Sequence, residues 1–351
     1  DNNTAVGKTS LGGNTTGADN TAVGSSALAV NTTGCRNTVV GFQAGLDNTT
    51  GCENAFFGRL AGCENTTGRN NTGIGSSSFN SNTTGNNNVA IGHSSLESNT
   101  TADDGIAIGY VALAQNTTGA MNVAVGNYSL DANTTAAQNT AVGVSALSAN
   151  TTGSQNVAVG LSAMQANTTA SCNTAVGWQA AVSVTTGTDN VVIGRCGTPN
   201  LTTGAGNITI GDAGNVSTRL FNIVGENNRF IAGHHNISNA YVKVAWTVTS
   251  DLRDKTEIKD VPLGLEFVDK LKPVSFKFKK SREDDTPTGT KHYGFLAQDI
   301  LELEGSDNVI IDDEQPDHLK YKGEHLVPVL VNAIKELSET NKDLKSRIEA
   351  L

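Results

Sequence analysis

Large aromatic side chains are scarce in this chain of 351 residues, where Phe, Trp and Tyr together make up 5%. Small residues, mainly Ala, Thr, Ser, Asn and Gly, dominate its first two thirds. Such a composition buries little apolar area per residue. It favours a thin structure that shares its core with other copies of the same chain.

Two further absences, of a basic block and of a long apolar run, exclude classes of function. The net charge is −10 and no block of basic residues occurs, so binding to nucleic acid or an anionic membrane surface is not expected. No apolar run reaches membrane-spanning length, which predicts no membrane insertion. No signal peptide is visible. Because the chain starts inside a repeat at Asp1, further sequence is expected upstream.

Metal and cofactor signatures are also absent. The adjacent His234 and His235 could bind a metal at a symmetry axis, but neck or surface histidines are the preferred interpretation, and no metal or cofactor is predicted. Cys35 and Cys52 are 17 residues apart, so they stand in one column of neighbouring repeats. A disulfide between them is geometrically conceivable, although two free thiols are the preferred interpretation. The cysteine spacings match no zinc pattern; the five are Cys35, Cys52, Cys63, Cys172 and Cys196.

What the chain does contain is a glycine that returns every 17 residues from Gly7 to Gly211, with no insertion or deletion across 13 repeats. Val, Ile or Phe precedes it each time. A fixed period with one apolar residue and one glycine is typical of a stacked coil. The first two thirds are therefore predicted to be a β-solenoid, and the fold class is mainly β.

One repeat, residues 139–155, illustrates the expected rung. A short strand at Thr140–Val142 is followed by a second β segment near Ala146–Leu147 or the Thr-Thr pair. Because side chains alternate along a strand, Thr140 and Val142 share one face and Ala141 points the other way. We predict that Val142 and Leu147 lie inside the coil. The small residue at 141 is interpreted as a place where another chain approaches closely. Aspartate at 142 is accordingly expected to disrupt the rod far more than aspartate at 144.

Asn-Thr-Thr recurs in ten rungs, and each triplet is formally an N-glycosylation sequon. Hydrogen-bonded ladders of stacked identical side chains are the preferred interpretation. Glycans on adjacent rungs would also crowd one another at a spacing of about 4.8 Å.

The residue after each periodic glycine varies from rung to rung and is expected to face solvent. Neutral drift on exposed turns is the simpler interpretation of this column. Tyr110 and Trp178 are its candidates for receptor contact, because an exposed ring stacks well on a sugar.

Composition changes abruptly after Asp212. Residues 1–212 contain 5 Lys or Arg and 11 Asp or Glu, so 24 − 5 = 19 and 34 − 11 = 23 remain for residues 213–351. We predict a rod over 1–212, a connector over 213–249 with strands near 220–224 and 240–248, a separate module over 250–327, and a helix over 328–351. Leu330, Ile334, Leu337, Leu344, Ile348 and Leu351 recur at alternating steps of four and three with Asn341 in phase, as in a coiled coil.

Ser250 and Lys255 form the one arrangement in the chain that suggests catalysis. A serine five residues before a lysine is a weak signal alone. It gains specificity from four segments that follow in order: LKPVSFKF at 271–278, YGFLAQDI at 293–300, LKY at 319–321 and LVPVLVNAIKEL at 326–337. Residues 249–351 with these motifs resemble the intramolecular chaperone of phage tail spikes and tail fibres, the endosialidase type.

This resemblance implies a homotrimeric chaperone that assembles the preceding β-structure and then cuts itself off. Ser250 would be the nucleophile, Lys255 the general base, and the bond between Thr249 and Ser250 the site of cleavage. No external substrate is expected. Asp254 departs from the family pattern, in which an apolar residue is common, and a chaperone that assembles without cutting is the alternative.

The rod resembles the β-roll heads of trimeric autotransporter adhesins. Together the two resemblances imply a trimeric tail fibre, located in the virion, that attaches to a host-surface glycan or protein. A bacterial surface or extracellular filament is the alternative. A polysaccharide-degrading spike would need paired carboxylates, and Asp103–Asp104 is the one adjacent acidic pair in the rod.

Overall fold

The computed structural model describes residues 2–211, 223–233, 250–279, 284–305, 308–314 and 316–350. The chain divides into two compact units, Asp1–Asn236 and Ile237–Leu351. Several earlier predictions fall on residues outside the described ranges: Thr249, the His234–His235 pair, the strand near 240–248, the first part of the strand near 220–224, and Leu351 at the end of the coiled-coil pattern.

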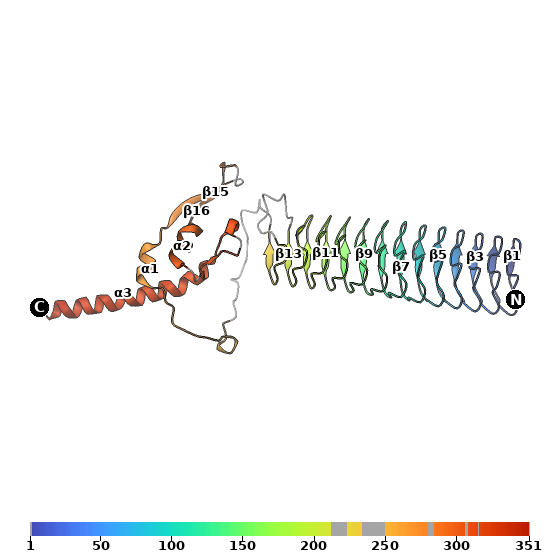
Figure 1. Ribbon diagram of the computed structural model, residues 1–351, viewed down its shortest axis with the longest axis horizontal. Helices are drawn as coiled ribbons and strands as arrows, with labels where there is room; N and C mark the ends of the chain where they lie inside the picture. Colours follow the sequence, from blue (N-terminus) through green and yellow to red (C-terminus); the bar gives the residue numbers. More distant parts are fainter. Residues whose placement is uncertain are drawn as a thin grey trace. The chain divides into compact units, whose positions relative to one another are not determined.

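The first unit is a β-solenoid whose strands pair in parallel in one 14-stranded sheet (Figure 1). Corresponding residues of neighbouring rungs pair directly, as Ala141 does with Ala158. The strands are β1 (Thr4–Val6), β2 (Thr21–Val23), β3 (Thr38–Val40), β4 (Ala55–Phe57), β5 (Thr72–Ile74), β6 (Val89–Ile91), β7 (Ile106–Ile108), β8 (Val123–Val125), β9 (Thr140–Val142), β10 (Val157–Val159), β11 (Thr174–Val176), β12 (Val191–Ile193), β13 (Ile208–Ile210) and β14 (Phe230–Ala232).

The coil therefore continues past the change in composition at Asp212. β14 pairs with β13 in register, with Ile208 opposite Phe230, so this last step is 22 residues long instead of 17. Ile223 belongs to the same buried core as the regular rungs.

The faces of the strands are the reverse of the prediction. Ala141 is fully buried, whereas Val142 is only half-buried and points out of the coil. The prediction that the valine column lies inside is wrong, and so is the interpretation of the alanine column as a contact with another chain. The coil is narrow, and the opposite wall of the same rung supplies Leu147, which is fully buried as predicted. Alanine leaves room for that leucine.

The expected second β segment is not a strand either. Among the described rungs, residues after the periodic glycine form turns, and the backbone at Ser145 (φ 56°) and Leu147 (φ 52°) is left-handed. Two left-handed residues curl the backbone too tightly for an extended segment. The rungs still bond to one another here, since the Leu147 N–H donates to the Ala163 carbonyl at 3.0 Å.

The periodic glycine is required for two reasons. At Gly143 the φ angle is 133°, a region that side chains rarely allow, and a Cβ would lie 2.5 Å from the Gly160 carbonyl oxygen of the next rung. The φ angle is positive at every glycine of this column from Gly7 to Gly211.

The Asn-Thr-Thr asparagines form a buried ladder. Asn48 Nδ2 donates to Asn31 Oδ1 at 2.9 Å and to the Gly51 carbonyl at 3.1 Å, and Asn48 is fully buried. A second ladder runs through the asparagine before each strand, where the Asn54 N–H and Nδ2 both donate to Asn37 Oδ1. The amide nitrogen that a glycan would need is occupied and inaccessible, which favours the ladder interpretation.

One region of the coil shows how tightly its width is set. Phe56 occupies the alanine column, and glycine replaces the expected leucine at Gly45 and Gly62. A Cβ on Gly62 would lie 2.6 Å from carbon atoms of the Phe56 ring. Large and small residues therefore exchange places across the core while its total volume stays roughly constant.

We expect Phe56→Ala to lower the free energy of unfolding by about 3 to 5 kcal/mol, because it leaves a cavity in the core. Gly62→Leu alone should also destabilise, since it collides with the ring. The double variant restores the usual Ala/Leu combination and should recover more than half of the loss. Thermal unfolding of the four proteins measures this coupling; strictly additive losses would contradict it.

The second unit is a small α+β domain. Its elements are η2 (Leu252–Asp254), α1 (Leu265–Lys270), β15 (Val274–Lys279), β16 (Pro287–Gly294), α2 (Ala297–Glu304), β17 (Ile311–Asp312), η3 (Pro316–His318), β18 (Lys320–Tyr321), η4 (Gly323–His325) and α3 (Leu326–Glu349). β15 and β16 form an antiparallel hairpin. The buried core is small, comprising Phe267, Ile300, Ile310, Ile311, Leu326 and Val329.

Two glutamates tie this domain together. Glu336 on α3 accepts a 2.7 Å hydrogen bond from the backbone N–H of Leu265 at the start of α1. Glu304 at the end of α2 accepts from the backbone N–H groups of Val309, Ile310 and Ile311 at 2.7–3.0 Å. The bond to Glu336 satisfies a free N–H in the first turn of α1, and the bonds to Glu304 hold residues 309–311 against the end of α2.

The predicted C-terminal helix is present as α3 and begins at Leu326, two residues before Pro328. Proline fits there because the first turn of a helix has no internal partner for its N–H.

Candidate functional site

Ser250 and Lys255, predicted to act together, are brought into contact. Lys255 Nζ donates a 2.6 Å hydrogen bond to Ser250 Oγ, and both residues are exposed in the single chain. The short helix η2 lies between them, so that the Lys255 side chain returns to Ser250, five residues earlier in the chain.

The turn itself is held by Asp251. Its carboxylate caps η2 by accepting from the Arg253 N–H at 2.9 Å, and it also pairs with the Arg253 guanidinium. These bonds hold the pKa of Asp251 below its usual range. Asp251 thereby holds the turn that separates Ser250 from Lys255, a role that the sequence pattern did not reveal.

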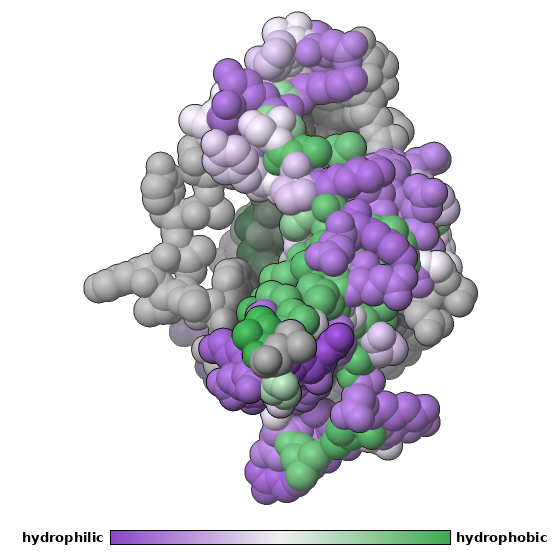
Figure 2. Space-filling model, turned by 90° about the vertical axis from the view of Figure 1, so that its left-hand side faces the viewer, coloured by the Kyte–Doolittle hydropathy of each residue, from purple (hydrophilic) through white to green (hydrophobic). Residues whose placement is uncertain are grey.

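Many large apolar side chains of this domain are exposed in the single chain. On α3 the predicted coiled-coil positions are uncovered, with Ile334 66% and Ile348 69% exposed. Figure 2, which faces the C-terminal end of α3, shows a band of hydrophobic side chains flanked by hydrophilic ones. Tyr293, at 84%, and Phe278, at 60%, are exposed on the hairpin. Exposure of this extent is typical of a surface that other chains cover.

Comparison with known proteins agrees with this part of the chain. Residues 250–310 match the family described as chaperone of endosialidase. The match begins at Ser250, the serine of the Ser–Lys pair. The family supports a chaperone that assembles trimeric fibres. No curated protein and no solved structure matches the chain.

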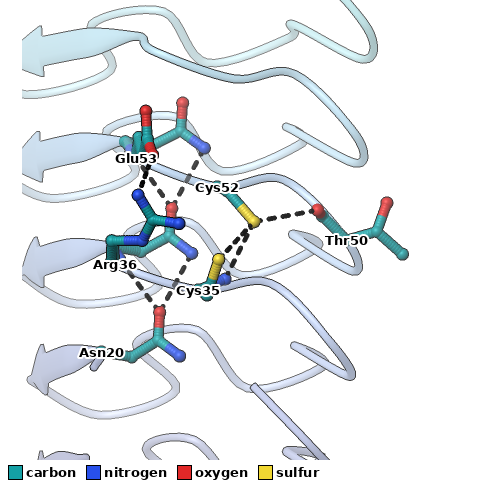
Figure 3. A network of polar contacts seen from close by, with 8 residues as sticks. Asn20, Cys35, Arg36, Thr50, Cys52 and Glu53 are labelled. Carbon is teal, nitrogen blue, oxygen red and sulfur yellow. Dashed lines mark hydrogen bonds and ion pairs between the residues drawn. The ribbon is translucent and has the colours of Figure 1, made fainter. Parts of the chain in front are cut away.

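In the rod, the cysteine pair lies as its spacing predicts. Cys35 and Cys52 stand one above the other with their Sγ atoms 2.9 Å apart, beside the ion pair of Arg36 and Glu53 (Figure 3). Both are free thiols. The hydrogen bond with Cys52 raises the pKa of the Cys35 thiol, and burial next to Asp47 and Glu64 raises that of Cys63 to about 11. These shifts disfavour the thiolate, so neither Cys35 nor Cys63 is an activated nucleophile.

The column after the periodic glycine is exposed, as predicted, except at the half-buried Ser25 and Ser76. Tyr110 and Trp178 are each 44% exposed. Tyr110 is part of a small aromatic cluster: its ring stacks on His93 at 5.4 Å and meets Tyr128 edge-on at 5.3 Å. His93 was recognisable from its place in the same column, whereas Tyr128 stands one residue later and was missed.

The acidic pair of the rod, Asp103 and Asp104, has a structural role. Asp103 Oδ1 accepts from the Asn86 N–H at 2.6 Å, and Asp104 Oδ1 from Asn87 Nδ2 at 3.2 Å, so both bridge to the preceding rung. Within the described ranges no cluster of His, Cys, Asp or Glu could hold a metal ion. Likewise, no helix in the part of the chain that the structure describes is long and apolar enough to cross a bilayer.

Proposed function

We propose that this chain is a trimeric tail fibre whose C-terminal unit assembles the rod and then separates from it by cutting between Thr249 and Ser250. The observation that carries the proposal is the 2.6 Å contact between Lys255 Nζ and Ser250 Oγ at the first residue of the family match. A virion or cell-surface location follows from this role.

The chemistry needs only these two side chains and water. A neutral Lys255 amine takes the proton from Ser250 Oγ, which attacks the carbonyl carbon of Thr249. The C–N bond breaks, the Ser250 nitrogen receives the proton, and an ester joins the two residues. Water then hydrolyses the ester, leaving a carboxylate on Thr249 and the free hydroxyl of Ser250.

Assembly would supply the exclusion of water that this reaction needs. In the single chain both Ser250 and Lys255 are exposed to water. Packing of copies over the exposed apolar residues of the unit would remove water from the pair and favour the neutral amine. Cleavage would then follow assembly and not precede it.

We propose further that the fibre attaches to a host-surface glycan through the aromatic residues of the column after the glycine. The exposed rings of Tyr110 and Trp178 support this role, because aromatic faces stack on the apolar faces of sugars. Tyr110→Ser or Trp178→Ser should weaken glycan-array binding at least tenfold, while Val144→Ser, an equally exposed neighbour in the same column, should not.

The assembly role is tested by deletion. The full chain should give a three-chain mass by light scattering, and the chain lacking residues 250–351 should give a mixture of aggregates. Low-complexity rungs can pair in many nearly equivalent registers, so a rod without its chaperone lacks a unique alignment. A full-length monomer, or a truncated chain that forms the same trimer unaided, would contradict the proposal.

A further inference from the structure

We infer that the outward face of the rod's sheet is the surface on which copies of this chain pack against one another. This surface, called here the sheet stripe, consists of the first and third residues of β1–β13. The inference rests on the proposed trimeric function and names the part of the rod that carries it.

The sheet stripe is continuous and uncharged, apolar at the third position of every strand and interrupted only by threonine at the first. Its third position is Val, Ile or Phe in every strand, and its first is Thr, Val, Ile or Ala. These side chains stay partly open to solvent in the single chain, for example Ile108 at 37% and Ile193 at 41% exposed. The alanine column between them is buried in the coil, so the apolar residues of the stripe are not needed for the core of a single rod.

The area of the stripe argues for a macromolecular partner. Thirteen rungs about 4.8 Å apart make it roughly 60 Å long. Two columns about 7 Å apart, widened by their side chains, make it about 10 Å wide. The resulting area of about 600 Å² is at the top of the range for the largest patch on a monomer, and approaches the about 800 Å² that each partner contributes to a stable interface.

The periodicity of the stripe selects a second copy of the chain as that partner. A parallel copy in register presents the same pair of residues at every level, apolar at the third position, over the whole length. Copies arranged around one axis bury all the stripes at once, and such an arrangement closes without leaving an open face. Phe57 is the single aromatic residue of the third column, so a slip by one rung would set its ring against a smaller side chain.

Cysteine cross-linking of the full chain tests this surface. The five native cysteines are replaced by serine or alanine, and Val142→Cys is introduced into the stripe. The matched control is Gln165→Cys, an exposed position beside Met164, whose side chain fills the core from the wall opposite the sheet. Copper phenanthroline in air serves as the oxidant that converts two thiols into one disulfide.

We expect the 142 variant to give a dimer band on non-reducing electrophoresis, since one disulfide joins two chains of a trimer and leaves the third single. The 165 variant should stay uncross-linked. Light scattering before oxidation measures whether the chain is a trimer, separately from whether the sheet stripe is the interface. A trimer that cross-links at 165 and not at 142 would overturn the sheet stripe while leaving the trimeric fibre intact, whereas a monomer would overturn both.

Discussion

The wild-type chain is expected to split into residues 1–249 and 250–351 once it has assembled, and Ser250→Ala is expected to stay whole. The alanine variant removes the hydroxyl that contacts Lys255 Nζ at 2.6 Å. Removing the nucleophile or base of such a pair typically lowers the rate by several orders of magnitude. Denaturing electrophoresis and the mass of the smaller fragment measure the result directly.

Two variants serve as controls for this prediction. Lys255→Ala should also stay whole, and both variants should still form trimers, because assembly depends on the packing of the unit and not on its chemistry. Thr256→Ala, next to the lysine, should cut normally. A single full-length band from a confirmed wild-type trimer after prolonged incubation would mean that this chaperone assembles without cutting.

Ala141→Asp is expected to prevent the rungs around it from forming. Ala141 is fully buried and stacks between Ala124 and Ala158, which are fully buried too. A carboxylate there has no partner and no water, which costs several kcal/mol. Circular dichroism and protease digestion of the full chain should show loss of the coil near this rung.

The neighbouring outward positions provide the contrast. Val142→Asp places the charge on the sheet stripe, so the coil should form while association of the copies weakens. Val144→Asp, at a position 45% exposed after the glycine, should leave both unchanged. Equal loss of the coil in the 141 and 142 variants would show that the inner and outer faces of the strand are not as the structure has them.

The sequence alone was enough to predict the coil, because its evidence is the strict period. Every 17 residues the backbone closely approaches the backbone of the next rung. A Cβ at that position would collide with it, so only glycine fits. The asparagine ladders follow from the same repetition. The cysteine pair was predictable for the same reason, since two residues one period apart must stand one above the other.

The choice of inner face was not predictable in this way. Alternation along a strand assigns Thr140 and Val142 to one face and Ala141 to the other, but both faces can be packed. The usual preference of valine for the interior pointed to the wrong one. The width of the coil decides which face lies inside. That width depends on Leu147, which enters the core from the opposite wall, and the left-handed turns that place it there were not evident from the sequence pattern.

In the C-terminal unit the sequence predicted the helix, the module and the residues Ser250 and Lys255, because their identities and order carry the resemblance. Only the tertiary structure decided that the two side chains touch, since this depends on the turn that Asp251 caps. It also decided how little of the unit's apolar surface a single chain can bury. Local repetition and motif order are properties of the chain itself, whereas the depth of a core depends on which segments meet across it.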